Sequence, residues 1–72
     1  MELSNASQAR SFVASWTNEC PNVATRKRAF SCAAKGLDMS IAICRSYPTK
    51  YAPETTQGYV DARQVLLDAA ED

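Results

Sequence analysis

The sequence predicts an all-α protein, a small bundle of about four helices that forms a single domain over residues 1–72. Apolar residues recur at spacings of three and four in the longest segments, which is the period of a helix face. No alternating apolar and polar run of four or more residues indicates a strand. The hydrophobic share of 46% is that of a globular chain, but 72 residues are enough for only one modest core.

The first predicted helix begins close to the N-terminus, where Ser4 or Asn5 supplies an N-cap. It ends before Pro21, because the residue that precedes a proline avoids the helical conformation. Trp16 lies on its apolar face, where a large ring serves as a core anchor. The apolar face consists of Leu3, Ala6, Ala9, Phe12, Val13, Trp16 and Cys20.

The second predicted helix is capped by Asn22 or Thr25 and ends at Gly36, the first glycine of the chain. Glycine closes helices readily because it adopts the left-handed conformation cheaply. Arg26, Lys27 and Arg28 are expected to cover the outside of this helix. The opposite, apolar face consists of Val23, Phe30, Ala33, Ala34 and Leu37.

The third predicted helix is short and occupies residues 37–47, between Gly36 and Pro48, with Asp38 as its N-cap. Its apolar residues point to nearly every side of a helix. A short helix that is apolar all round is usually buried, so we predict that this one is the centre of the bundle. These apolar residues are Met39, Ile41, Ala42, Ile43 and Cys44.

The last predicted helix follows a connector that carries two prolines, and it begins at Pro53 or at a cap formed by Thr55 or Thr56. Gly58 near its start weakens the first turns by about 1 kcal/mol relative to alanine. The predicted core of the whole protein draws on all four helices. It consists of Phe12, Val13, Trp16, Phe30, Ala33, Leu37, Ile41, Ala42, Tyr59 and Leu66.

Charge is balanced overall but unevenly distributed. The formal net charge is zero, which argues against a protein whose main task is to bind nucleic acid or an anionic membrane. Residues 10–50 carry seven basic and two acidic side chains, whereas residues 51–72 carry one basic and five acidic ones. Either the last helix folds back and pairs with the basic middle of the chain, or the molecule presents one basic and one acidic face to a charged protein partner.

The three cysteines indicate reduced thiols in a cytosolic protein. Cys20, Cys32 and Cys44 are an odd number, twelve residues apart, and the chain has no histidine. We expect Cys32 and Cys44 to pack as small apolar side chains. One disulfide with one free thiol is the alternative.

Few residues in the sequence offer the chemistry of an enzyme, a metal site or a membrane segment. Without histidine the chain lacks the usual general base, and its carboxylates form no recognisable catalytic pair. The longest apolar run covers residues 41–44, far too short to cross a bilayer. We therefore expect no catalytic residues, no metal, no cofactor and no membrane partner.

A helix-turn-helix that binds DNA is the alternative function. Cys32 lies four residues before Gly36, Leu37 follows it, and Ala42 comes six residues later, spacings that suit this motif. Arg45, however, falls where an apolar residue should pack, and the second helix offers apolar side chains where bases would be read.

The first choice of function is a small cytosolic protein-interaction module that acts by stoichiometric binding. Its size suits an inhibitor or adaptor of a larger protein complex, of the kind that phages and mobile elements encode. Arginine pairs with carboxylates through two bonds at once, so we expect a partner with an acidic surface. The predicted binding face combines Arg26, Lys27, Arg28, Arg45 and Lys50.

Overall fold

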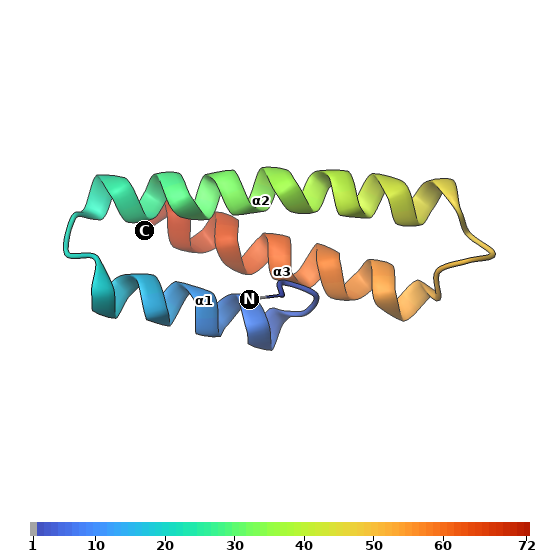
Figure 1. Ribbon diagram of the computed structural model, residues 1–72, viewed down its shortest axis with the longest axis horizontal. Helices are drawn as coiled ribbons and strands as arrows, with labels where there is room; N and C mark the ends of the chain where they lie inside the picture. Colours follow the sequence, from blue (N-terminus) through green and yellow to red (C-terminus); the bar gives the residue numbers. More distant parts are fainter. Residues whose placement is uncertain (1) are drawn as a thin grey trace.

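The computed structural model describes residues 2–72 and contains three α-helices (Figure 1). Helix α1 covers Ala6–Glu19, α2 covers Val23–Ser46 and α3 covers Pro53–Glu71. The all-α class is therefore confirmed, whereas the expectation of four helices is wrong. The predicted second and third helices are two halves of α2.

Helix α2 passes through Gly36 without a break, although a helix end was predicted there. The buried side chains explain why. Phe30, Ala34, Leu37, Ile41 and Cys44 follow one another at spacings of four and three, so the apolar stripe continues past the glycine on the same side of the helix. No glycine within residues 2–72 adopts a positive φ, so Gly36 keeps a helical backbone. Packing of this stripe against α3 outweighs the weak helix propensity of one glycine.

The central element of the bundle is α3, not residues 37–47. Helices α2 and α3 form a long antiparallel hairpin, and α1 packs mainly on α3 with few direct contacts to α2 (Figure 1). Because α1 has 14 residues and α2 has 24, α1 extends about 15 Å less along the bundle. The half of the hairpin that includes residues 37–47 is consequently covered on one side only.

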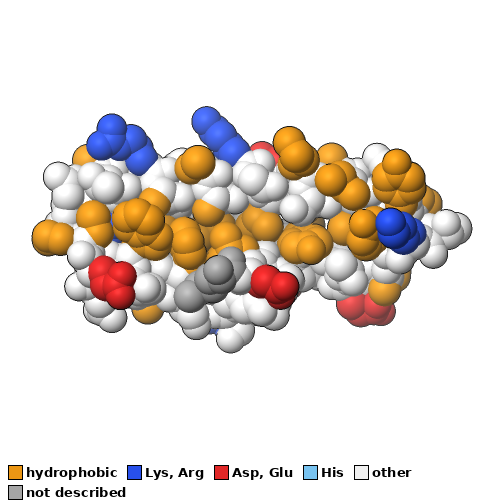
Figure 2. Space-filling model, viewed as in Figure 1, with side chains coloured by type: hydrophobic (Ala, Val, Ile, Leu, Met, Phe, Trp, Pro, Cys, Tyr) orange, Lys and Arg blue, Asp and Glu red, His pale blue; other side chains and the backbone are white. Residues whose placement is uncertain are grey.

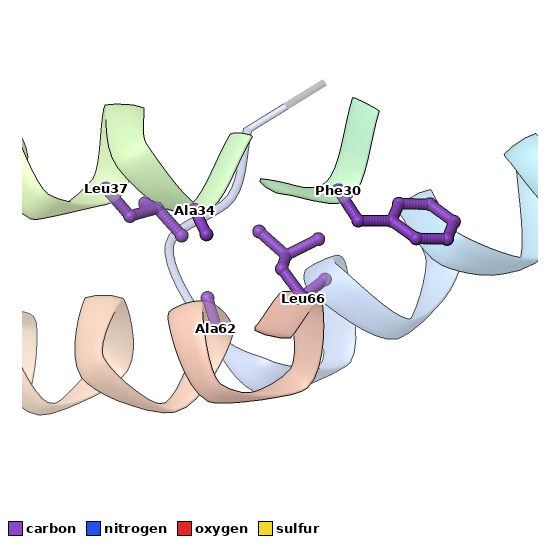
Figure 3. Close-up of a cluster of buried hydrophobic side chains, with 6 residues drawn as sticks. Phe30, Ala34, Leu37, Ala62 and Leu66 are labelled. Carbon is purple, nitrogen blue, oxygen red and sulfur yellow. The ribbon is translucent and has the colours of Figure 1, made fainter. Parts of the chain in front are cut away.

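The core lies where all three helices meet. Leu66 of α3 is fully buried and points toward α2 between Ala34 and Phe30, with Ala62 one turn away (Figure 3). The ring of Phe12 meets the ring of Phe30 edge-on, with the ring centroids 6.2 Å apart. Small residues at these positions, Ala34 and Ala62, let the helix backbones approach closely.

Most of the predicted core is confirmed. Phe30, Leu37, Ile41 and Leu66 are buried, and the remaining predicted members except Ala42 are half-buried. Ala42 is exposed because it lies at the flank of α2, beside an open hollow that it lines with Val60 and Arg63 of α3. Cys44 is buried, as expected for its thiol, and the buried residues outside the predicted core are Ala9, Ala34 and Ala62.

Side-chain caps fix the first two helix starts. The Asn5 carboxamide oxygen accepts a hydrogen bond from the backbone N–H of Gln8, and Asn22 does the same for Thr25, each over 2.9 Å. Helix α3 has no side-chain cap and begins instead with Pro53 at its first position. Asp38, the predicted cap of the third helix, lies inside α2 and pairs with Arg63 of α3.

Candidate protein-interaction surface

The hairpin between α2 and α3 ends in a compact turn. Pro48 follows the end of α2, since a proline cannot continue the helix. The backbone carbonyl of Tyr47 accepts hydrogen bonds from the backbone N–H groups of Lys50 and Tyr51, over 3.0 and 3.2 Å. The turn therefore places Tyr51 back against the two helices that it joins.

A hollow lies at this end of the hairpin, between the last turn of α2 and the first turns of α3. Its lining is largely apolar and includes Pro48, Tyr51, Pro53 and Val60, together with the side chain of Arg45. We call it the tip hollow. A concave apolar lining beside a charged group is the usual form of a binding site for a side chain of another molecule.

Two positive charges accompany the tip hollow. Arg45 contributes to its lining, and the Lys50 ammonium group lies 5.6 Å from the ring centroid of Tyr51, a cation–π distance. Within residues 2–72, neither cation forms an ion pair, since the one ion pair of this part of the chain joins Asp38 to Arg63. Both charges are therefore free to meet an acidic group from outside.

The five predicted binding residues do not form one face. Arg26, Lys27 and Arg28 lie in the first two turns of α2, whereas Arg45 is in its last turn and Lys50 is in the hairpin turn. At 1.5 Å per residue, Arg28 and Arg45 are about 26 Å apart along the helix. Arg45 thus lines the tip hollow and Lys50 lies beside Tyr51 of its lining, whereas the other three residues are at the opposite end of α2.

Arg26 has a role within the fold itself. Its guanidinium Nη1 donates a 2.6 Å hydrogen bond to the backbone carbonyl of Cys20, just after the end of α1. This carbonyl belongs to the helix end, where the intrahelical partners are missing. Arg26 thereby fastens the turn between α1 and α2, while Arg28 is exposed and makes no side-chain hydrogen bond among the described residues.

The turn that a helix-turn-helix would need is missing from the described part of the structure. The motif needs a turn at Gly36, but this residue lies in the middle of a continuous helix. The helix-turn-helix in this segment is therefore ruled out, and the small residue before the glycine, Cys32, is exposed on the outside of α2. DNA binding as such stays a prediction without this geometric support.

The last helix folds back along α2, as one of the two expected charge arrangements requires. Asp72 lines a hollow with Arg26 and Lys27, but no ion pair joins them among residues 2–72. Pairing of the acidic last helix with the basic middle segment would join carboxylates of α3 to arginines and lysines of α2. The ion pair found within residues 2–72 has the opposite sense, since Asp38 of α2 pairs with Arg63 of α3. Two acidic residues of α3, Asp61 and Asp68, instead accept hydrogen bonds from glutamines one turn earlier on the same helix.

The thiols and the acidic residues form no cluster that suits a metal. Cys20, Cys32 and Cys44 are all free, with only Cys44 buried. Cys32 was expected to be packed and is exposed, because it lies on the side of α2 opposite the core. In the part of the chain described, no group of three or more potential metal ligands comes together.

Comparison with protein-family models, with curated proteins and with solved structures finds no match to this chain. Among the described residues, every helix is too short or too polar to cross a membrane.

Proposed function

We propose that this protein is a small cytosolic interaction module that binds one protein partner stoichiometrically, as an inhibitor or adaptor of a larger complex. The tip hollow is its binding site. The single observation that carries the proposal is the combination of an apolar hollow with two cations, Arg45 and Lys50, that have no acidic partner within residues 2–72.

The partner fitted by this site presents an acidic segment with one apolar or aromatic side chain. The apolar side chain would enter the hollow against Tyr51 and Val60, where its burial supplies most of the affinity. Carboxylates on either side of it would pair with Arg45 and Lys50. Such charges at the rim accelerate association and select the partner more than they add affinity.

The remaining basic residues are the competing site. Lys27 and Arg28 lie at the other end of α2 and can be changed without removing the hydrogen bond that Arg26 makes to the turn. This separation provides two matched variants, each with two charge reversals on the same protein. One is Arg45→Glu with Lys50→Glu, and the other is Lys27→Glu with Arg28→Glu.

The test is capture of the partner from host lysate by each variant and by the wild type, in parallel with and without nuclease. We expect the Arg45→Glu/Lys50→Glu variant to lose a captured protein that the other variant retains, with circular dichroism and melting unchanged in both. Loss in the Lys27→Glu/Arg28→Glu variant alone would place the site at the other end of α2. Loss of all captured material after nuclease would favour a nucleic-acid partner instead.

A further inference from the structure

We propose that the chain pairs with a second copy of itself through the outer side of α2, with the two helices antiparallel. This surface is separate from the tip hollow and the proposal goes beyond the binding of a partner there. It is a stripe of residues on the side of α2 that faces away from the core. The residues of this outer stripe are Ala29, Cys32, Gly36, Met39, Ile43 and Tyr47.

The outer stripe has the spacing of a helix-packing surface. Its members follow one another at intervals of three or four residues over about five turns, so they lie on one side of the helix. Charged side chains are absent from the stripe itself. Its exposed members Cys32, Gly36 and Met39 lie on the side of α2 away from the residues that pack onto the core, which include Phe30, Leu37 and Ile41. Ala29 is half-buried, and Ile43 lies toward one flank, where it lines a hollow with Tyr51 and Tyr59.

The second half of the outer stripe exposes large apolar side chains. Met39 is 70% exposed, Tyr47 57% and Ile43 44%, because these side chains do not lie on the side of α2 that packs against α3. Hydrophobic side chains gather over this part of α2 and the neighbouring part of α3 on the visible face of the molecule (Figure 2). Apolar groups of this size, contiguous on one helix, are typical of a protein–protein contact.

The first half of the outer stripe carries small residues. Ala29 and Cys32 are short, and a Cβ atom added to Gly36 would meet nothing within 4 Å. This half of the stripe therefore carries no large side chain, and the space over Gly36 is open. The two halves of the stripe are complementary in size, one with projections and the other with room for them.

Two-fold symmetry with antiparallel helices brings these halves together. In a symmetric contact centred between residues 37 and 38, Met39 lies against Gly36 of the second copy and Ile43 lies against Cys32 of the second copy. One turn further, Tyr47 covers Ala29 of the second copy. Each contact occurs twice, as an isologous interface requires. A parallel pair would instead place large residues on large and small on small.

The charges along α2 favour the same orientation. Arg28 and Lys35 lie beside the first half of the outer stripe and no acidic residue of α2 precedes Asp38. In a parallel pair the two basic halves would lie side by side and repel each other. In the antiparallel pair each basic half lies beside the less basic half of the other copy, which reduces this repulsion.

The exposed area of the chain is consistent with such a contact. The accessible surface is 4811 Å², whereas a compact monomer of 7.9 kDa has about 4,400 Å². A contact over residues 29–47 is about 27 Å long and would bury on the order of 1,000 Å² in total. This area is close to the lower limit for specific interfaces, so we expect a dissociation constant on the order of micromolar.

The first experiment places a large side chain at Gly36, where the proposed contact needs a small residue. Gly36→Leu has room in the single chain but would collide with Met39 of the second copy. Ala42→Leu is the matched control, since it adds the same side chain to another exposed position of α2. By sedimentation equilibrium, the wild type and Ala42→Leu should approach twice 7.9 kDa as concentration rises, while Gly36→Leu stays near 7.9 kDa. A wild type that remains monomeric at millimolar concentration would overturn the proposal.

The second experiment tests the register. In a Cys20→Ser background, Ile43→Cys places a thiol that should form a disulfide with Cys32 of the second copy when a mild oxidant such as oxidised glutathione is added. The same two positions within one chain are about 16 Å apart, too far for a bond. Adding Cys32→Ser should abolish the crosslinked dimer. A crosslink that persists would indicate parallel pairing through residue 43 of both copies and would refute the antiparallel arrangement.

The outcome is independent of the proposed function. Gly36→Leu leaves Arg45, Lys50 and the tip hollow unchanged, so it should still capture the partner protein from lysate. If the wild type captured the partner protein but did not dimerise, only the self-pairing would be overturned. Dimerisation of a variant that has lost capture, Arg45→Glu with Lys50→Glu, would show that the two surfaces act separately.

Discussion

The two glycines of this chain should respond in opposite directions to the same substitution. Both lie in helix interiors with an ordinary helical backbone, so alanine should stabilise each helix by about 1 kcal/mol. At Gly36 nothing opposes this gain, because an added Cβ atom would meet no other atom within 4 Å. We expect Gly36→Ala to raise the free energy of unfolding by about 1 kcal/mol.

Gly58 differs because the N-terminal segment lies directly on it. A Cβ atom at this position would collide with the backbone carbonyl oxygen of Ser4. This carbonyl cannot move alone, since the Ser4 backbone N–H and hydroxyl both donate 2.7 Å hydrogen bonds to the Gln8 carboxamide and Asn5 caps α1. The methyl group would therefore push the start of α1 away from α3.

The magnitude follows from these two effects. Overpacking of this kind costs about 1–3 kcal/mol, which exceeds the gain in helix propensity. We expect Gly58→Ala to lower the free energy of unfolding by about 1 kcal/mol. Since 1 kcal/mol shifts Tm by about 4–8 °C in a chain of this size, the two alanine variants should differ by about 10 °C.

The assay is thermal and urea unfolding followed by circular dichroism. A truncated chain that begins at residue 6 supplies the control, because removal of Ser4 also removes the collision. In that chain Gly58→Ala should become stabilising, which a double-mutant cycle would register as a coupling energy. If Gly58→Ala stabilised the full chain as much as Gly36→Ala does, the packing of the N-terminal segment on α3 would be refuted.

Three further substitutions test the packing, the turn and the caps. Leu66→Ala should cost about 3–5 kcal/mol and leave much of the chain unfolded at 25 °C, while Leu67→Ala, at a half-buried site, should lower the urea midpoint less; equal effects would contradict the described core. Arg26→Met should lose about 1 kcal/mol with its hydrogen bond to the end of α1, whereas Arg28→Met should change the melting temperature little. Asn22→Ala should cost about 1 kcal/mol in the same measurement, and no change would exclude its capping role.

The local features of this fold were predictable because they depend on neighbouring residues. The ends of α1 and the start of α2 follow from Asn5, Pro21 and Asn22, each of which acts within one turn of its own position. The start of α3 at Pro53 is of the same kind. The large side chains of the core were also predictable, since apolar periodicity reports which side of a helix is buried.

The helix end wrongly predicted at Gly36 shows the limit of predictions made from neighbouring residues. A glycine with an aspartate two residues later is a local signal for a helix boundary, and the sequence contains it. The continuous stripe of Phe30, Leu37 and Ile41 gives the contrary signal, and only the presence of α3 alongside it decides between them. The free energy gained when the whole stripe packs against α3 is larger than the cost of about 1 kcal/mol for one glycine inside a helix.

The candidate site was predicted only in part for a similar reason. The sequence identified the basic residues as candidates for binding. The distance between them depends on α2 being one long helix, and the helix end wrongly predicted at Gly36 divided α2 into two short helices. The tip hollow could not be foreseen because it needs Arg45, Tyr51 and Val60 from three segments that meet only in the folded hairpin. A lysine before a tyrosine between two prolines was the one signal in the sequence that could have drawn attention to it.

The sequence by itself determined the helical class, the capped helix starts and the identity of the large core residues, because these depend on interactions within a few residues along the chain. The tertiary structure alone decided that α2 is one long helix, that α3 is central, and that residues 37–47 expose Met39 and Ile43 instead of burying them. The physical reason is that an apolar helix is buried only where another element packs against it. Along this half α2 packs on α3 alone, so only the side with Leu37, Ile41 and Cys44 is covered.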